Sequence, residues 1–331
     1  MKSNFAVYNK EQKIGSITSA DISVVVQGAV SPLTGTCLKT IRENLPKAQI
    51  ILSTWKGTDT RNLSYDELVL SEDPGAMPLV RNDPKHLNNL NRQLVSTQNG
   101  LKKASRKYVL KIRSDVQLTT DKFITAYEKY RAPAWHFHSK VLIVDYYSRN
   151  PNVVPVPYHP SDWMMFGENT DVAAYYNVPF MPPKYMNYFS THDNKARFFR
   201  EVLHLYTPEQ WICYQFLCKK DEKIQLKSYY DNSSKNRNFS LKMFRDDFII
   251  VNAADIGLHF NKYNPNRSLE HFMLISHQDW LHLQKDISAV DVYTVVRKNI
   301  FNIRCAISIL LERLRLKNTL HSFLKTIRDI H

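Results

Sequence analysis

The most informative chemistry-bearing residue is Asp115, which follows Arg113 and Ser114 at the end of the apolar run YVLKIRSD (108–115). A carboxylate at the end of a buried strand can hold Mg²⁺ or Mn²⁺, because these cations prefer oxygen ligands and substrate phosphates. Arg113 could instead bind a diphosphate, or form an ion pair with Asp115 that only closes the strand. The spacing alone leaves the metal site and the structural ion pair open as alternatives.

A second polar cluster, YHPSDW, precedes the apolar run MMFG. His159 and Asp162 are three residues apart in a turn, where they could supply a general base or a metal ligand. Trp163 offers a flat face for a sugar or a base. In the alternative interpretation Asp162 caps the next element and Trp163 packs in the core, and the local pattern slightly favours this alternative.

Further polar groups stand at the ends of two apolar runs and in the first turns of two predicted helices. An amide followed by a bare glycine backbone can contact a nucleobase, although such a pair is more often a tight turn. Polar groups in the first turn of a helix favour anions, although an exposed polar face is the commoner explanation. These residues are Gln27, Gly28, Thr54, Trp55, Asn91, Arg92, Gln93, Glu209 and Gln210.

Three short apolar runs must position these groups, over residues 21–30, 49–55 and 108–115. They are rich in Val, Ile and Leu and too short for helices, which is typical of strands buried on both faces of a parallel sheet. Ligands of open α/β sheets bind beyond the carboxyl ends of such strands. Further strands are expected over 67–70, 134–147 and 248–252, and helices over 36–45, 88–104, 121–131 and 207–219.

This alternation predicts an α/β fold with a Rossmann-like, mostly parallel sheet flanked by helices. His136 and His138 alternate on the expected strand 134–147 and should face the same side as core or surface residues. Residues 220–245 alternate charged, Asn and Ser residues, which indicates a solvated excursion. Residues 1–20 are polar, so we expect an N-terminal arm and no signal peptide.

Composition narrows the function classes. The chain has 331 residues, a formal net charge of +14 and only eight glycines, with neither G-x-G-x-x-G nor a P-loop motif. Such a charge favours phosphates, an anionic membrane face or nucleic acid, but no nucleic-acid motif is present. The four cysteines are too few for a disulfide framework and suggest reduced, cytosolic thiols. No apolar run reaches the length of a spanning helix.

The stretch 296–316 is predicted to be a basic amphipathic helix. Ile303, Ile307 and Leu310 share one helical face, and Arg297 and Arg304 are among the basic residues around it. Such a helix can rest on anionic lipid headgroups, or it can pack its apolar face on the domain and leave its charges in water. We favour the membrane interpretation, because the positive excess is concentrated here.

Seven segments together resemble one known family. They are DISVVVQG, LPKAQIILSTWKG, the turn DPG at 73–75, NLNRQLVSTQNGLKKA, YVLKIRSD, HPSDWMMFG and TPEQW, spread over about residues 20 to 220. In this order they resemble the WavE lipopolysaccharide synthesis family, which implies a bacterial enzyme of surface-polysaccharide assembly. The resemblance also implies a GT-A-type glycosyltransferase, whose nucleotide-sugar lies at the strand ends of a Rossmann-like sheet.

In that type of enzyme an Asp-x-Asp motif commonly binds the metal. Arg113-Ser114-Asp115 stands in its place, with Arg113 where the first carboxylate belongs. The resemblance therefore implies a nucleotide-sugar co-substrate and a site for Mn²⁺ or Mg²⁺ at Asp115, or neutralisation of the diphosphate by Arg113 instead of a cation.

The expected roles form two groups. The donor would lie near residues of the strand ends and of one helix start, and the acceptor would lie near the YHPSDW turn and the TPEQW helix, with Asp162 as the first and Glu209 as the second candidate base. The donor group is Gln27, Gly28, Thr54, Trp55, Asn91, Arg92, Arg113, Ser114 and Asp115, and the acceptor group is His159, Ser161, Trp163 and Gln210.

The implied organisation is an arm (1–20), a catalytic domain (21–260) and a helical extension (261–331). The catalytic domain would comprise a nucleotide-sugar half (21–120) and an acceptor half (121–260). The function implied is transfer of a sugar to a lipopolysaccharide, O-antigen or capsule acceptor. This acceptor would be a lipid-linked or core oligosaccharide, and the reaction would take place at the cytoplasmic face of the inner membrane. Two alternatives are a non-catalytic scaffold of a polysaccharide assembly complex and, on charge alone, a nucleic-acid-binding protein; we expect no nucleic-acid partner.

Overall fold

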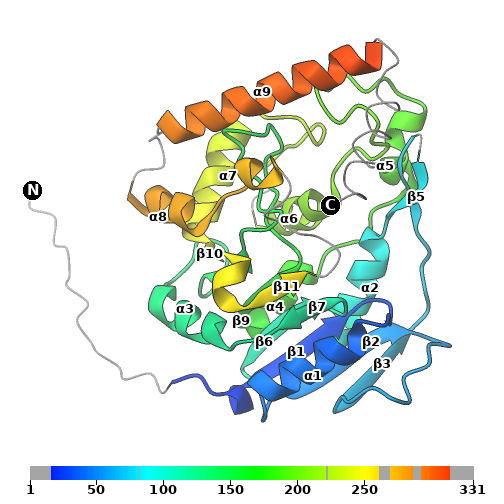
Figure 1. The fold of residues 1–331 in the computed structure, drawn as a ribbon, viewed down its shortest axis with the longest axis vertical. Helices are drawn as coiled ribbons and strands as arrows, with labels where there is room; N and C mark the ends of the chain where they lie inside the picture. Colours follow the sequence, from blue (N-terminus) through cyan, green and yellow to red (C-terminus); the bar gives the residue numbers. More distant parts are fainter. Residues whose placement is uncertain (1–15, 82, 221–222, 261–268, 286–291, 314–331) are drawn as a thin grey trace, which may run out of the picture.

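The computed structural model describes residues 16–81, 83–220, 223–260, 269–285 and 292–313. At its centre is a seven-stranded sheet in the order β10-β8-β9-β6-β1-β2-β3 (Figure 1). Every strand is parallel to its neighbours except β9, which runs antiparallel to β6 and β8. The strands are β1 (Ile22–Gln27), β2 (Gln49–Trp55), β3 (Glu67–Ser71), β6 (Tyr108–Arg113), β8 (Val141–Val144), β9 (Met164–Glu168) and β10 (Phe248–Val251).

Helices flank this sheet, and two small antiparallel strand pairs accompany it. The pairs are β4 (Met77–Val80) with β5 (Asp83–Asn88), and β7 (Val116–Leu118) with β11 (Leu258–Phe260). The α-helices are α1 (Thr34–Asn44), α2 (Leu90–Leu101), α3 (Lys122–Tyr130), α4 (Asn169–Tyr176), α5 (Pro183–Met186), α6 (Pro208–Cys218), α7 (Ser234–Asp246), α8 (His277–Lys285) and α9 (Val292–Arg313).

The predicted fold class, an α/β fold with a mostly parallel sheet flanked by helices, is confirmed. The three apolar runs become β1, β2 and β6, which lie side by side with almost every residue buried. The predicted helices correspond to α1, α2, α3 and α6. Thr207 caps α6 as its sequence indicates, since its hydroxyl accepts a hydrogen bond from the Gln210 amide. The solvated excursion predicted for 220–245 is wrong in its second half, where α7 buries Leu241, Met243 and Phe244.

The long strand predicted over 134–147 is also wrong, because only β8, Val141–Val144, is a strand. His136 and His138 therefore do not share a strand face. His136 is buried, with its Nδ1 2.6 Å from Asp247 Oδ2, whereas the His138 side chain is 79% exposed beside Asp171. Buried carboxylates organise this loop through its backbone amides, a side-chain interaction that residue periodicity does not report.

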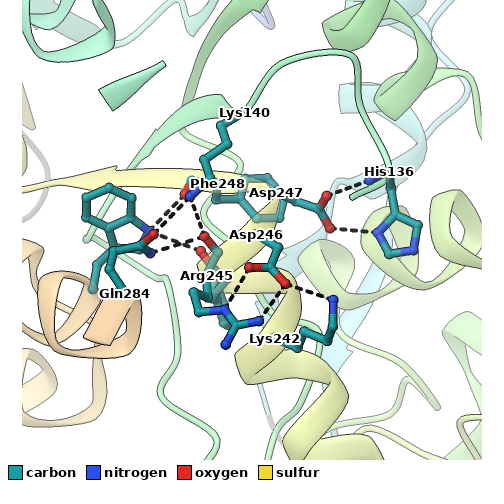
Figure 2. A network of polar contacts seen from close by, with 10 residues as sticks. His136, Lys140, Lys242, Arg245, Asp246, Asp247, Phe248 and Gln284 are labelled. Atoms are coloured by element: carbon teal, nitrogen blue, oxygen red, sulfur yellow. Dashed lines mark hydrogen bonds and ion pairs between the residues drawn. The ribbon is translucent and has the colours of Figure 1, made fainter. Parts of the chain in front are cut away.

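Figure 2 shows how polar contacts join this loop to α7, β10 and α8. The Asp247 carboxylate accepts a hydrogen bond from the His136 amide, and Lys140 donates to the Arg245 carbonyl and to Gln284. Asp246 faces outward, paired with Arg245 and Lys242. These contacts fix the β8–β10 edge of the sheet.

The opposite half of the sheet depends on a close approach by α2. Gly100 in this helix lies so near the sheet that an added methyl group would be 2.5 Å from Val25 Cγ1 and 3.1 Å from Ser53 Cβ. Both neighbours belong to buried strands that cannot move aside freely. Glycine thus sets the distance between α2 and the sheet.

We expect Gly100→Ala to destabilise the protein by about 1–3 kcal/mol, because the overlap with Val25 outweighs the better helix propensity of alanine. Gly35→Ala is the matched control, since the new methyl group in α1 would make only an ordinary contact, 3.8 Å from Leu63. Urea unfolding of both variants measures the difference. Equal free energies of unfolding for the two variants would show that α2 can shift without cost.

Candidate active site

A cleft of about 410 Å³ opens at the carboxyl edge of β1, β2 and β6. Small-molecule sites commonly have this volume and lie at this edge of open α/β sheets. Gln27, Asp115 and Asp162, which are far apart in the sequence, all line it. The complete lining is Gln27, Gly28, Ala29, Ser31, Trp55, Asp73, Asn89, Arg92, Gln93, Arg113, Ser114, Asp115 and Asp162.

The wall formed by the end of β1 is held in place by hydrogen bonds. The Gln27 side-chain carbonyl accepts a hydrogen bond from Ser96 Oγ of α2 at 2.9 Å. Gly28 has a φ of +118°, and a Cβ there would lie 3.2 Å from Ser114 Oγ. Ser114 in turn donates to the carbonyl of Ala29 at 2.7 Å. The turn after β1 is therefore fixed by Ser114, which stabilises the cleft wall and is itself almost buried.

Two arginines bring positive charge to the cleft, and each is held by a carboxylate. Arg113 donates two hydrogen bonds to Asp115, at 2.9 and 2.8 Å. Arg92 donates two to Asp73, both at 2.7 Å. This fork-to-carboxylate geometry orients both guanidinium groups. Hydrogen bonding to Arg92 lowers the pKa of the Asp73 carboxyl, so this pair is charged at neutral pH.

The side chains around Asp115 do not form a set of ligands that fits a divalent metal. Both oxygens of its carboxylate accept hydrogen bonds from Arg113, and Asp73 in the same cleft is occupied by Arg92. Among the residues that the structure describes, no group of three or more His, Cys, Asp and Glu side chains could hold a metal ion. Of the two alternatives at 113–115, the observed geometry is the ion pair.

Asp162 reaches the cleft because β9 is antiparallel to β6, so that the start of β9 lies at the end of β6. The Asp162 backbone carbonyl accepts a hydrogen bond from Lys111, a fully buried lysine of β6. Burial lowers the pKa of this lysine to about 8. Trp163 is buried and lies beneath Arg113, whose guanidinium carbon is 4.0 Å from the indole centroid. Trp163 thus supports an arginine through a cation–π contact.

Glu209 and His159 form a buried pair behind Asp162. His159 Nε2 lies 3.4 Å from the Glu209 carboxyl, and Nδ1 lies 3.0 Å from the Tyr147 carbonyl oxygen. Burial, reinforced by the positive charge of Arg149, holds the pKa of His159 well below its usual value. Burial, reinforced by the charge of Asp162, raises the pKa of Glu209 to about 8.

These directions assign the protons at neutral pH. A neutral His159 must donate from Nδ1 to the Tyr147 carbonyl, which leaves Nε2 as an acceptor. Glu209 then keeps its proton and can donate it to Nε2. Asp162 and Glu209 are two carboxyl groups in different environments, the arrangement that separates acid and base roles.

Several expected site residues do not line the cleft. Thr54 is fully buried, because it alternates with Trp55 on β2 and points away from the cleft. Asn91 bonds instead to both backbone groups of Met181. Ser161 and Gln210 are fully buried, and Gln210 donates to the carbonyls of Pro157 and Tyr229. The cleft lining therefore does not include Thr54 and Asn91, expected near the donor, or Ser161 and Gln210, expected near the acceptor.

Other lining residues had no assigned donor or acceptor role, namely Ala29, Ser31, Asp73, Asn89 and Gln93. Gln93 is the most informative of them, because its buried Nε2 has no hydrogen-bond partner within the described residues. A buried donor without a partner costs free energy unless a ligand or water satisfies it. The sequence already places Gln93 with Asn91 and Arg92 in the first turn of a helix, where anions are favoured, although no donor contact was assigned to it.

Comparison with solved structures gives distant, partial likenesses. TarS 1–349 of S. aureus is 13% identical over 68% of this chain and 56% of that one, with a TM-score of 0.27. The apo-form glycosyltransferase GlyE of Streptococcus pneumoniae TIGR4 is 10% identical over 86% of this chain and 63% of that one, with a TM-score of 0.34. The chain therefore spans less than two thirds of the length of either protein. Likenesses this weak carry no argument about the reaction.

Comparison at the level of sequence is more decisive. No curated protein sequence matches the chain. The family model described as WavE lipopolysaccharide synthesis, however, matches residues 22–314, which include every strand of the central sheet and every residue that lines the cleft. The chain belongs to the WavE lipopolysaccharide synthesis family.

Proposed function

We propose that the protein is a glycosyltransferase that moves a sugar from a nucleotide-sugar donor to a lipopolysaccharide, O-antigen or capsule acceptor. The observation that carries this proposal is the convergence of Gln27, two clamped arginines and Asp162 on one cleft at the carboxyl edge of the sheet. The cleft thus combines an amide, cationic groups and a carboxylate. Membership of a lipopolysaccharide synthesis family agrees with this activity.

In the proposed complex the nucleotide lies along the ends of β1 and β2. Gln27 and Gly28 contact the base, where the missing side chain of Gly28 allows close approach. Trp55 stacks near the nucleoside. The unpartnered Nε2 of Gln93 donates a hydrogen bond to the nucleotide-sugar, and Arg92 and Arg113 face the diphosphate of that sugar nucleotide.

The reaction breaks the bond between the anomeric carbon and the diphosphate oxygen, and the electron pair leaves with the nucleoside diphosphate. Arg113 and Arg92 stabilise the developing negative charge, the role that a metal ion would fill in an Asp-x-Asp enzyme. The acceptor hydroxyl oxygen bonds to the anomeric carbon, and its proton passes to a carboxylate. We propose that arginines bind the diphosphate, because the metal ligands that the described residues offer at this site do not fit Mn²⁺ or Mg²⁺.

Asp162 is the proposed base, because it lines the cleft, whereas Glu209 lies behind it and holds a proton at neutral pH. The protonated Glu209 and the neutral His159 lie in contact beside Asp162, with His159 Nε2 3.4 Å from the Glu209 carboxyl. In this arrangement residues 21–120 bind the donor and residues 121–260 supply the base and the acceptor side. The acceptor is a lipid-linked or core oligosaccharide, met at the cytoplasmic face of the inner membrane.

Donor binding is expected to be independent of metal. UDP-, GDP-, CMP- and dTDP-sugars, UDP-GlcNAc included, are screened by thermal shift, with Mn²⁺ or with EDTA. At least one class of nucleotide-sugar should raise the Tm of the wild type by the same amount with Mn²⁺ and with EDTA. Arg113→Gln should abolish this rise in Tm, because the two phosphates of the ligand then lose one guanidinium partner.

Arg61→Gln is the control, since Arg61 is 86% exposed and does not line the cleft. A Tm shift that requires Mn²⁺ would overturn the metal-independent assignment. A shift with no nucleotide-sugar at all, together with salt-sensitive retention on DNA or RNA, would favour the nucleic-acid alternative.

Asp162→Asn should lower kcat by about 10²–10⁴-fold and leave donor binding intact, because only proton acceptance is lost. Glu43→Gln, an exposed carboxyl of α1, should change nothing. Transfer is followed with the donor class that the thermal shift identifies. Near-normal turnover by Asp162→Asn would remove the base, and donor binding without any turnover in the wild type would favour the non-catalytic scaffold.

Glu209 gives the reaction a distinct dependence on pH. As the pH rises through about 8, Glu209 loses its proton, and its carboxylate then faces the lone pair of His159 Nε2. We expect the kcat of the wild type to fall in this pH range. Glu209→Gln keeps an uncharged hydrogen-bond donor at this position, so we expect it to be active at neutral pH and its kcat not to fall as the pH rises through about 8. A loss in Glu209→Gln as large as in Asp162→Asn would transfer the base role to Glu209.

A further inference from the structure

Helix α9 carries an unusual concentration of exposed apolar side chains. It lies along the top of the molecule in Figure 1, at the end opposite α1 and β1. Of the eleven large exposed hydrophobic residues that the described part of the chain contains, seven belong to this helix. They are Val292, Tyr293, Val295, Val296, Ile303, Ile307 and Leu310.

The face of α9 that packs on the protein is held partly by polar contacts. Arg297 is 2% exposed, and its guanidinium forms an ion pair with Asp279 at 3.0 Å. It also donates to the carbonyl oxygens of Phe272 and Leu274. Phe301, one turn further along the helix, packs against Phe198. The inner face of α9 thus contains a buried, paired cation, and the apolar stripe lies on the exposed side of the helix.

The outer face carries an apolar stripe that is interrupted once, at the exposed Asn299. Val292, Val296, Ile303, Ile307 and Leu310 recur at helical spacing, opposite the buried positions 294, 297 and 301. From the first to the last, the stripe is about 27 Å long at 1.5 Å per residue. Ile303, near the middle of the stripe, is 60% exposed. A stripe of this length on one face indicates an interaction surface.

Positive charge borders this stripe on both sides. Lys298 and Arg304 are exposed, and at 100° per residue they lie on opposite sides of the helix, between the outer stripe and the buried face. Long basic side chains beside an apolar stripe can reach phosphate groups while the stripe enters an apolar layer.

We propose that this outer face of α9 docks on an anionic phospholipid bilayer, with the stripe at the boundary between headgroups and acyl chains. None of the described helices is long and apolar enough to cross a membrane, so the helix lies in the plane of the surface. A second copy of the chain is the poorer partner, because pairing two such faces would bring together two molecules with a net charge of +14 each. An anionic bilayer supplies the opposite charge.

The test uses the full chain and co-sedimentation with vesicles of phosphatidylcholine, alone or mixed with phosphatidylglycerol. The wild type should sediment with the mixed vesicles and stay in the supernatant with phosphatidylcholine alone. Combined Ile303→Ser, Ile307→Ser and Leu310→Ser should weaken partitioning by about tenfold or more. Combined Lys298→Glu and Arg304→Glu should weaken it as well and reduce its sensitivity to salt.

Two matched controls keep this test specific. Leu70→Ser, Leu87→Ser and Phe180→Ser remove exposed apolar side chains elsewhere, and Lys47→Glu with Lys85→Glu removes exposed charges elsewhere. Both controls should sediment as the wild type does. The proposal would be overturned if the serine variant of α9 sedimented with the vesicles as well as the wild type does. It would also be overturned if the wild type did not bind vesicles but formed a dimer that the serine substitutions dissociate. Because α9 supplies no residue to the cleft lining, donor thermal shifts should be unchanged in every α9 variant.

Discussion

The parallel register of β1 with β2 and β6 decides which side chains meet at the cleft. Gln27 pairs in register with Ser53 on one side and with Arg113 on the other. The polar ends of three strands are thereby brought to the same level, within reach of one small molecule. The register is in turn enforced by burial, since a slip of one residue would turn the alternating side chains of these buried strands to the wrong faces.

Reversal of one strand completes the site. Because β9 runs against β6, the turn before β9 delivers Asp162 to the edge where the parallel strands end. Two contacts then hold this turn: Lys111 donates to the Asp162 carbonyl from below, and Trp163 lies beneath Arg113. The hydrogen bond from Lys111 to the Asp162 carbonyl offsets part of the cost of taking this cation out of water. The proposed base and the proposed diphosphate-binding arginine therefore share one support.

The fold was largely predictable, because β1, β2 and β6 are apolar runs whose burial on both faces leaves little ambiguity. The segment around His136 was not predictable, because Asp247, more than a hundred residues later, holds it through backbone amides. At the site, Gln27 and Asp115 at strand ends and Asp162 in the turn before β9 line one cleft, as expected, whereas alternation within β2 turns Thr54 into the core. Composition could place positive charge on α9, yet only tertiary contacts show Arg297 facing inward and the isoleucines outward.

The carboxylates that hold Arg113 and Arg92 also affect which anions can compete for the cleft. In the free protein each guanidinium already has a partner, so the cleft offers less attraction to chloride or to a lone carboxylate than its two arginines would suggest. In the proposed complex a ligand with two linked phosphates engages both guanidinium groups and gains from chelation, whereas separate monoanions must displace Asp115 and Asp73 one at a time. In this proposal the ion pairs therefore favour a diphosphate over single anions.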